Sequence, residues 1–479
     1  MIKFGTGGWR AVIGDGFTKK NMQLLTAALC EKMKRDGCAS CGIVLGYDRR
    51  FLSKESMRWC AKAAAAAGIT ASLINQSSPT PLIMFYMMQH RLPYGMMITA
   101  SHNPAIYNGI KVFTEGGRDA EQAVTDEIER IAGTLDADGI SEMDYEEALS
   151  RGLIREIYPQ NEYLDHILGK LDTDAIRSAH LKVAADPMFG VSEVPLQTLL
   201  LTTRCDVAML HNTHDALFGG RMPAPNAATM RQLSTRVMDY SFDIGVATDG
   251  DADRLGVIDD TGRYLTANDI LVLLYYYMLK YRGERGAVVR NVATTHMLDR
   301  VAARFGQECY EVPVGFKYIS AKMAETDALI GGESSGGLTV RGHINGKDGI
   351  YAAMLLVEML AVTGRKLSGM FEEIREECGS IFMEERNCRL KNEAQKQMLW
   401  ERLFDRRELP AFPEELERVS YLDGVKVYFK CGGWVIARFS GTEPLLRIFC
   451  EMPDGMRAAK ICGLFEDFLG ISKGRMLGE

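Results

Sequence analysis

Short apolar runs alternate with stretches of helical spacing along most of the chain. The first part predicts buried strands and intervening helices at residues 43–48, 54–67, 71–74, 81–90 and 95–100. The same pattern recurs at residues 181–186, 242–247, 268–281, 287–290 and 328–331. Because strands alternate with helices, the pattern favours α/β layers built on a largely parallel sheet.

The pattern changes after about Gly379. An acidic stretch of helical spacing comes first, and alternating residues then predict strands at 424–430, 434–439 and 446–450 before a terminal helix. This last part predicts a separate α+β domain. Charged or glycine-bearing stretches near 135–155 and 364–380 are the expected domain boundaries.

Length and charge limit the possible classes of protein. A chain of 479 residues is too long to fold around one compact core. We therefore expect about three or four domains of roughly 100–150 residues each. The net charge of −7 argues against binding to nucleic acid or to an anionic membrane by bulk charge, although local arginines can still bind phosphate. The longest apolar run, 270–279, is too short to span a bilayer. The sequence shows no apolar core of a signal peptide, and its eleven cysteines are scattered. We therefore expect a cytoplasmic protein whose thiols are reduced.

A serine follows the strand expected at 95–100, in the motif TASHNP at 99–104. The carboxyl end of an α/β strand is where such sheets bind ligands, so Ser101 is well placed for chemistry and His102 can position phosphate. Ser, Asn and Pro are also ordinary turn formers, and the motif alone supports a functional serine and a plain turn equally. A Ser-His-Asp hydrolase is disfavoured because the Gly-x-Ser-x-Gly elbow is missing here.

An acidic motif, DGDADR at 249–254, follows the strand expected at 242–247. Alternate residues of a tight loop can aim three carboxylates at one point, and such charges are costly together unless a cation neutralises them. All-oxygen ligands suit Mg²⁺, which keeps positions for water and substrate phosphate. An EF-hand needs Gly sixth and Glu twelfth, where this chain has Arg254 and Asp260. The remaining alternative is a solvated acidic turn.

Two neighbouring motifs offer polar contacts to a ligand. In GGESSGG at 331–337 the glycines let a ligand approach the backbone, and Glu333 and Ser335 can bind sugar hydroxyls. In HINGKDG at 343–349, His343 or Lys347 can serve in proton transfer or phosphate contact. A flexible loop and ordinary surface residues are the simpler alternatives.

The motif RFSGTEP at 438–444 is typical of an anion cradle. Arg438 and Arg447 can grip phosphate bidentately, and hydroxyls and backbone amides around a glycine turn complete the site. The motif has no Walker A lysine pattern and so does not indicate a nucleotide P-loop. A β-hairpin turn with an incidental arginine is the alternative.

Taken in this order, from FGTGGWR at 4–10 to Arg447, the motifs resemble those of the α-D-phosphohexomutase superfamily, the phosphoglucomutases and phosphomannomutases. Four motifs in order over almost the whole chain are far more specific than any one of them. The resemblance implies a four-domain architecture around a central cleft, with three similar α/β domains and a smaller C-terminal α+β domain. The domains are expected at 1–150 with the serine loop, 151–258 with the metal loop, 259–375 with the sugar loop and 376–479 with the phosphate loop.

The resemblance also implies roles for single residues. Ser101 is expected to carry the phosphoryl group and to bind Mg²⁺ together with Asp249, Asp251 and Asp253. The residues expected around the reacting phosphate are Arg10, His102, Lys111 and Arg254. The residues expected to bind the rest of the substrate are Glu333, Ser335, Lys317, Arg438, Ser440, Gly441, Thr442 and Arg447.

The implied reaction passes a phosphoryl group from Ser101 to the free hydroxyl of a hexose monophosphate. The resulting hexose 1,6-bisphosphate turns round and returns its other phosphate to Ser101, so Mg²⁺ and the bisphosphate are the expected cofactor and primer. The expected partner is a sugar phosphate, with no nucleic acid and no membrane.

Two departures from the mannomutase pattern affect the expected substrate. Gly337 stands where many members have His after the sugar-loop Ser-Gly, and Phe316 stands where they have His after Val-Gly. This version looks more like the glucomutase branch, so glucose phosphate is the expected substrate and mannose phosphate the next. Lys347, His343 and Lys111 remain candidates for the general acid and base.

Other activities remain open alternatives. They are a phosphoglucosamine or phosphopentose mutase, a Mg²⁺ phosphatase and a sugar-phosphate-binding protein without turnover.

Overall fold

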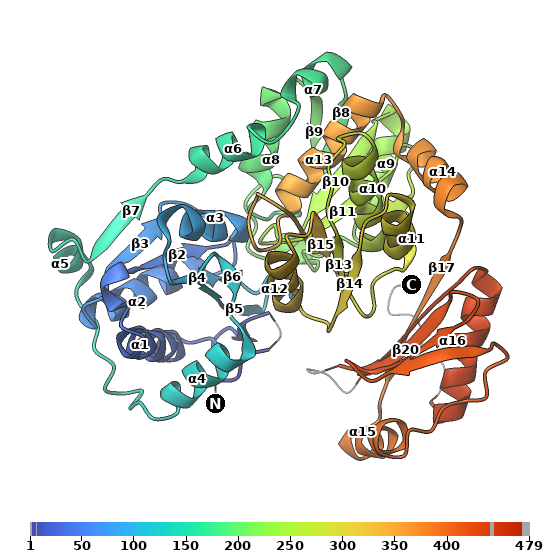
Figure 1. Cartoon of the computed structure of the whole chain (residues 1–479). Coiled ribbons are helices and arrows are strands. Elements are labelled where there is room, and N and C mark those ends of the chain that lie inside the picture. The colour runs from blue at the N-terminus through green and yellow to red at the C-terminus, as the bar shows by residue number, and fades with distance from the viewer. Residues whose placement is uncertain (1, 6, 441–444, 472–479) are drawn as a thin grey trace. The chain divides into compact units, whose positions relative to one another are not determined.

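The computed structural model describes residues 2–5, 7–440 and 445–471. These residues fall into two compact units, Met1–Tyr277 with Ser335–Met370, and Met278–Ser334 with Phe371–Glu479. Figure 1 labels the helices and strands. Helices α10 (Ala267–Lys280) and α14 (Leu367–Cys378) each contain a point of division.

The first sheet of the first unit has the order β1-β5-β4-β2-β3-β7. Its strands in that order are Trp9–Val12, Tyr107–Thr114, Tyr94–Ile98, Ile43–Tyr47, Ala71–Ile74 and Ile154–Ile157, with β6 (Arg118–Asp119) paired to β5. Its helices are α1 (Lys19–Arg35), α2 (Ser53–Ala66), α3 (Thr80–His90), α4 (Gln122–Ala132) and α5 (Tyr145–Ser150). Strands β4, β2, β3 and β7 are parallel, whereas β5 runs antiparallel to β4 and β1. The sheet is therefore mixed.

The second sheet has the order β12-β11-β10-β8-β9. Its strands in that order are Tyr264–Leu265, Leu255–Ile258, Ile244–Thr248, Lys182–Asp186 and Asp206–Met209. The other elements of this part are α6 (Gln160–Leu168), α7 (Thr173–Ala179), α8 (Glu193–Thr202), α9 (Arg231–Tyr240), β16 (Leu338–Val340) and α13 (Gly349–Thr363). Only β10, β8 and β9 are parallel, and β11 returns antiparallel beside β10.

The second unit begins with three parallel strands in the order β14-β13-β15 (Cys309–Val312, Val288–Asn291 and Ile330–Gly332), with helices α11 (Met297–Arg304) and α12 (Phe316–Thr326). An antiparallel sheet follows in the order β17-β21-β20-β19-β18. Its strands in that order are Phe382–Arg389, Leu445–Met452, Trp434–Phe439, Val425–Phe429 and Leu416–Ser420, with helices α15 (Glu393–Trp400) and α16 (Gly455–Leu469). Helix α16 lies along this sheet in Figure 1, and apolar residues of the helix and the sheet form one core.

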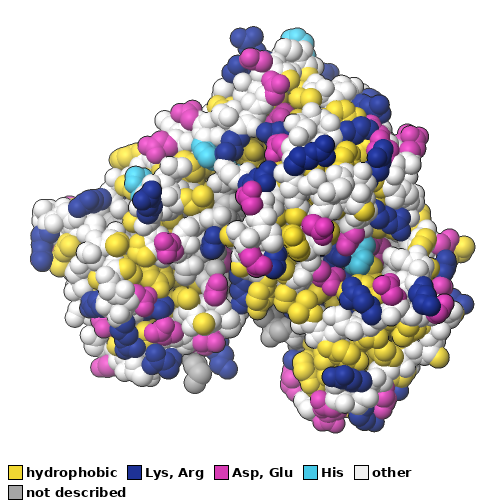
Figure 2. All heavy atoms as spheres, in the orientation of Figure 1, with side chains coloured by type: hydrophobic (Ala, Val, Ile, Leu, Met, Phe, Trp, Pro, Cys, Tyr) yellow, Lys and Arg dark blue, Asp and Glu magenta, His cyan; other side chains and the backbone are white. Residues whose placement is uncertain are grey.

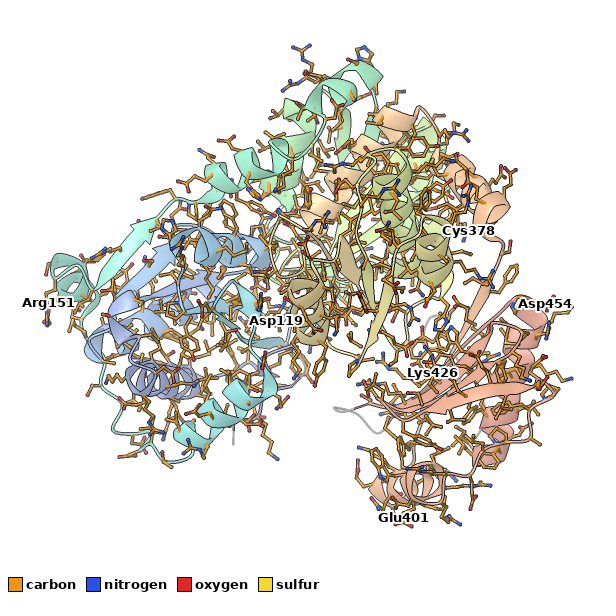
Figure 3. The ribbon with its side chains drawn as sticks, viewed as in Figure 1. Asp119, Arg151, Cys378, Glu401, Lys426 and Asp454 are labelled. Carbon is orange, nitrogen blue, oxygen red and sulfur yellow. The ribbon has the colours of Figure 1, made fainter. Side chains whose placement is uncertain are left out.

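A buried polar network joins these two parts of the second unit. Lys426 of β19 is 1% exposed and its Nζ donates to Val292 O at 2.7 Å and to Glu311 Oε2 at 2.7 Å (Figure 3). Burial opposes ionisation, but a hydrogen bond from His296 and the charge of Lys426 hold the pKa of Glu311 below its usual range. A lysine buried with its acceptors satisfied fixes one packing of the antiparallel sheet on β13 and β14.

Most expected elements agree with the structure, and two expectations are wrong. The α/β layers are mixed rather than largely parallel, because β5 and β11 return as antiparallel strands. The acidic stretch after Gly379 is a strand, β17, over its first eight residues from Phe382, because it pairs with β21 along its whole length. Helix α15 follows β17, strands β19, β20 and β21 lie at the three expected positions, and the final helix is present, so the expected α+β part is confirmed, with β18 as an additional strand.

The eleven cysteines are free thiols, as expected. Among the residues described here, no helix is long and apolar enough to cross a membrane. Lys, Arg, Asp and Glu side chains are interspersed over the face shown in Figure 2.

Candidate active site

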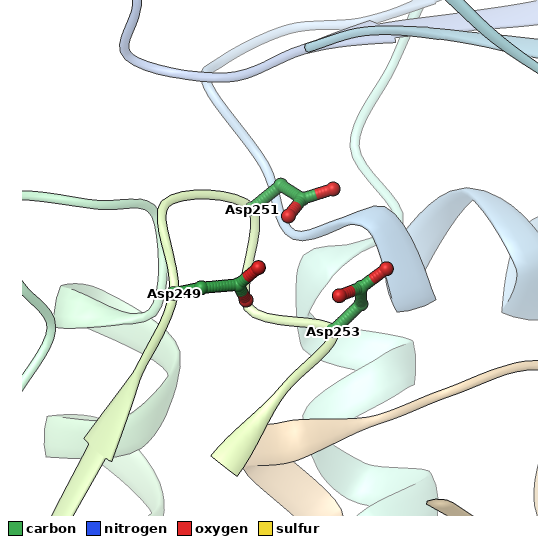
Figure 4. Close-up of side chains that lie close together, drawn as sticks. All are labelled: Asp249, Asp251 and Asp253. Atoms are coloured by element: carbon green, nitrogen blue, oxygen red, sulfur yellow. The ribbon is translucent and has the colours of Figure 1, made fainter. Parts of the chain in front are cut away.

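Three carboxylates converge in the loop that follows β10 (Figure 4). Asp249, Asp251 and Asp253 are buried, and one ligand oxygen of each lies within 4.8 Å of the others. The loop turns at Ala252, whose φ is 62°, and Thr80 at the start of α3 donates its backbone N–H to Asp251 O at 2.9 Å. The alternating aspartates therefore aim at one point, as their spacing predicts.

Two lysines from distant parts of the first unit neutralise much of this charge. Lys111 of β5 donates to Asp251 Oδ2 and to Asp253 Oδ2, each at 2.6 Å. Lys347, from the loop before α13, places its Nζ 3.0 Å from Asp253 Oδ2. The triad thus depends on β5 and on the segment before α13 as well as on its own loop.

The neighbouring charges shift the pKa values of Asp249 and Asp253 in opposite directions. Burial opposes ionisation of Asp253, but the charges of Lys111 and Lys347 hold its pKa well below the usual range. Burial and the charges of Asp251 and Asp253 instead raise the pKa of Asp249 well above it. Burial alone would lower the pKa of Lys111, but Asp251 and Asp253 raise it, so this lysine stays an ammonium. The site therefore still favours one more positive charge.

The residues present fit Mg²⁺. Asp251 Oδ1 and Asp253 Oδ1 are buried and have no hydrogen-bond partner among the described residues. Buried polar atoms in proteins are nearly always paired, so two such oxygens on converging carboxylates are positioned for a ligand. A cation with oxygen ligands would satisfy both atoms and would also favour ionised Asp249.

Ser101 lies beside this triad, at the end of β4. Its hydroxyl donates to Asp249 Oδ2 at 2.8 Å, and Nδ1 of His102 lies 3.4 Å from the same hydroxyl oxygen. Gly250 permits the close approach of the two loops, because a Cβ there would lie 2.9 Å from Ser101 O. The structure therefore brings the serine and metal loops together.

Cationic and neutral groups surround Ser101. Arg10 of β1 donates to Asn103 Oδ1 at 2.6 Å, and Arg254 Nε lies 3.9 Å from Asp253 Oδ1 and 4.0 Å from Asp249 Oδ2. Burial, with the charges of Arg254 and Arg10, lowers the pKa of His102 to about 2. His102 is therefore neutral and adds no charge beside Ser101.

Lys347 and His343 have different surroundings, although they are four residues apart. A Cβ at Gly337 would lie 2.1 Å from Lys347 Cδ, so the glycine makes room for the lysine stem. His343 is 3% exposed and its Nε2 lies 2.6 Å from Asp348 Oδ2, which also accepts from Tyr163 Oη at 2.7 Å. Asp348 in turn caps α13. Lys347 reaches the triad, whereas His343 stabilises the start of a helix.

The other expected binding residues lie mostly in the second unit. Arg438 of β20 faces Arg447 of β21 in register, and its Nε donates to Asp423 Oδ1 at 2.9 Å. Asp423 Oδ2 accepts from Val314 N at 2.8 Å, which ties Arg438 to the segment that leads to Lys317 at the start of α12.

The remaining expected residues are placed as follows. Glu333 follows β15 and accepts from Asn291 Nδ2 at 3.5 Å, and Ser440 follows β20. Ser335 lies between β15 and β16. Gly441 and Thr442 lie outside the described residues.

Three residues that contact the serine and metal loops are not predicted as site residues by the sequence motifs. Thr80 donates from Oγ1 to Asp251 Oδ2 at 2.7 Å. Asp48 and Arg50 follow β2 and bind the backbone and Thr99 of the serine loop. A position directly after strand β2, parallel to β4, is the sequence signal that could have found Asp48 and Arg50.

Comparisons with known proteins agree with this geometry. Phosphoglucomutase/phosphomannomutase alpha/beta/alpha domains I, II and III match residues 1–138, 161–262 and 266–378, and the C-terminal domain of the same family matches 385–467. A phosphoglucomutase/phosphomannomutase of Thermococcus kodakarensis is 28% identical over 94% of both chains. A probable phosphoglucosamine mutase of Methanocella arvoryzae is 30% identical over 96% of both.

A solved structure supports the fold. A phosphoglucomutase/phosphomannomutase family protein from Burkholderia thailandensis has a TM-score of 0.81 at 22% identity and covers 98% of each chain. The chain belongs to the phosphoglucomutase/phosphomannomutase family, in the α-D-phosphohexomutase superfamily. It is an intramolecular phosphotransferase of the mutase type, and its expected four-domain class is confirmed.

Replacing one carboxylate of the triad is expected to weaken binding of Mg²⁺. Asp251→Asn keeps the shape of the side chain but removes a charge and one anionic ligand, so we expect at least about tenfold weaker binding, equivalent to ~1.4 kcal/mol. Isothermal titration with MgCl₂ measures this directly. Asp260→Asn, which changes a carboxylate bound to Ser368 instead, is the control and should bind Mg²⁺ as the wild type does. Equal affinities for the two variants would contradict a metal site at the triad.

Proposed function

We propose that this protein interconverts hexose 1-phosphate and hexose 6-phosphate through a phosphoserine at Ser101 and a hexose 1,6-bisphosphate. The observation that carries the proposal is the contact of the Ser101 hydroxyl with the buried, lysine-neutralised triad at Asp249. A hydroxyl in a turn without function needs no such cluster of charges around it. Here the charges surround the atom that would carry the phosphoryl group.

In the proposed first half-reaction the bond between phosphorus and Ser101 Oγ breaks as a bond to the sugar oxygen forms. Asp249, Asp251 and Asp253 would hold Mg²⁺, which when bound would supply positive charge to the transferring group. Arg10 and Arg254 add cationic side chains beside the same group. Because the charge developing in the transition state is stabilised by groups already in place, catalysis is mainly electrostatic positioning.

Lys347 is the best placed of the three candidates for moving the proton of the sugar hydroxyl. Lys111 is held as an ammonium between two carboxylates, and His343 Nε2 is bound to Asp348. Lys347 reaches the triad across Gly337, with its Nζ 3.0 Å from Asp253 Oδ2 and a side chain that is 12% exposed. To accept this proton Lys347 must be a neutral amine, a form that the positive charge of a cation bound at the triad would favour. In the second half-reaction the same atom would return the proton to the oxygen that loses phosphate.

The non-reacting phosphate is proposed to bind Arg438 and Arg447 with Ser440, Gly441 and Thr442. The facing arginines on β20 and β21 support this, because two guanidinium groups in register can grip one dianion. Glu333, Ser335 and Lys317 are proposed to contact the sugar.

Glucose phosphate is the proposed substrate, with mannose phosphate next. An amino sugar is the second candidate, because the relative from Methanocella arvoryzae, 30% identical to this chain, is named a probable phosphoglucosamine mutase. Both sugars would use the same chemistry at Ser101. A phosphopentose substrate and a binding protein without turnover are weaker alternatives, the latter because Ser101 and all three aspartates are present.

A coupled assay tests the reaction and the sugar together. With Mg²⁺ and a bisphosphate primer, glucose 1-phosphate should be converted faster than mannose 1-phosphate or glucosamine 1-phosphate, whereas Ser101→Ala should lose about 10⁴-fold or more in kcat with an unchanged melting temperature. Faster conversion of glucosamine 1-phosphate would change the proposed substrate to an amino sugar and would leave the proposed mutase reaction in place. Conversion of none of the three would reject the hexomutase reaction.

Variants at positions 347 and 337 test the proton-transfer role. Lys347→Met should lower kcat by about 10²–10⁴-fold, because the proton of the hydroxyl loses its acceptor. Gly337→Ala should lower kcat in the same direction, since the added Cβ displaces the lysine stem. Lys366→Met, at an exposed lysine, is the control and should change neither kcat nor KM. A kcat for Lys347→Met within twofold of the wild type would assign the proton to another group.

A further inference from the structure

Arg50 is buried directly beneath the serine loop. Its side chain is 0% exposed, and its Nη2 donates to Ser101 O at 2.6 Å and to Asn103 O at 2.7 Å. Its Nη1 donates to Pro104 O and Tyr107 O, each at 3.0 Å. One guanidinium thus binds four backbone carbonyls between Ser101 and the first residue of β5.

Asp48 connects the same guanidinium to the other side of Ser101. Its Oδ2 lies 3.3 Å from Arg50 Nε and accepts from Thr99 Oγ1 at 2.7 Å. Thr99 Oγ1 in turn accepts from Ser101 N at 2.8 Å. Both the N–H and the C=O of Ser101 are therefore held, directly or through Thr99, by one buried ion pair.

This bonding matters because Ser101 has an unfavourable backbone conformation. Its φ is 52°, in the left-handed region that is unfavourable for a serine. That conformation directs Oγ to Asp249. Such a residue keeps its conformation only where the surrounding contacts fix it, and here those contacts lead to Asp48 and Arg50.

We propose that Arg50 is a positioning residue that holds Ser101 in its left-handed conformation and so keeps the phosphoryl-carrying oxygen aimed at the triad. The proposal rests on the proposed function of Ser101. Arg50 does not touch the reacting atoms, because its donors are all bound to backbone carbonyls or directed at Asp48. It acts on the reaction only through the geometry of the loop.

The planar guanidinium is essential to this role. Arginine presents five N–H donors in a rigid fork, whereas lysine has one nitrogen on a flexible stem and cannot reach the same four carbonyls together. Phe218 covers the group, with its ring centroid 4.9 Å from Arg50 Cζ. Arg49, one residue before, is instead paired with Glu193, so the two adjacent arginines offer a matched comparison.

Arg50→Lys tests the proposal, with Arg49→Lys as the control. Arg50→Lys should lower kcat by about a hundredfold with KM for the hexose phosphate within twofold of the wild type, because the reacting oxygen is misplaced while the substrate contacts stay intact. Backbone amides of 101–107 should exchange hydrogen faster. Arg49→Lys should change neither quantity. A kcat within twofold of the wild type, a matching rise in KM, or unchanged exchange at 101–107 in Arg50→Lys would overturn the proposal.

A second variant covers the case in which Arg50→Lys fails to fold. Thr99→Val keeps the side-chain shape but removes the link between Asp48 and Ser101 N. It should lower kcat in the same way and speed exchange at Ser101, and wild-type values for both would overturn the proposal. Hydrogen exchange needs no turnover, so it tests the positioning even if the wild type converts no hexose phosphate, which would reject the proposed function alone.

Discussion

The mutual repulsion of three buried carboxylates constrains the rest of the first unit. Asp249, Asp251 and Asp253 lie in one loop, and their charges are tolerated only because Lys111 and Lys347 reach them from β5 and from the segment before α13. Residues far apart in the sequence must therefore fold around one point. Two carboxylate oxygens still lack hydrogen-bond partners among the described residues, which leaves the cluster suited to a cation.

The same constraint explains how the serine loop is built. Ser101 contacts Asp249 only because its backbone is left-handed and because Gly250 lets the metal loop approach. A second buried ion pair, Asp48 with Arg50, fixes that backbone. The conformational cost at Ser101 is thus met within the folded protein, so the proposed phosphoryl transfer would need no reorganisation of this loop.

The sequence predicts the parts of this site that are local. Ser101 and the aspartates follow apolar strands directly, so position and spacing suffice to propose them. The position directly after β2 draws attention to Arg49 and Arg50 alike, but nothing in the sequence of this pair shows which guanidinium turns inward. The role of His343 was left open because its bond to Asp348 and the partner Tyr163 appear only in the fold. The spacing of charged residues in β17 predicts a helix, because the strand gains its pairing only from β21, which lies much later in the chain.

The most direct test of the whole account is the phosphorylation state of Ser101 during turnover. Protein incubated with Mg²⁺ and glucose 1,6-bisphosphate is digested and the peptide that contains Ser101 is weighed by mass spectrometry, before and after a hexose monophosphate is added. The account predicts one phosphate on Ser101 that is lost to the sugar when the monophosphate arrives. Turnover of hexose phosphate while Ser101 stays unmodified would contradict it.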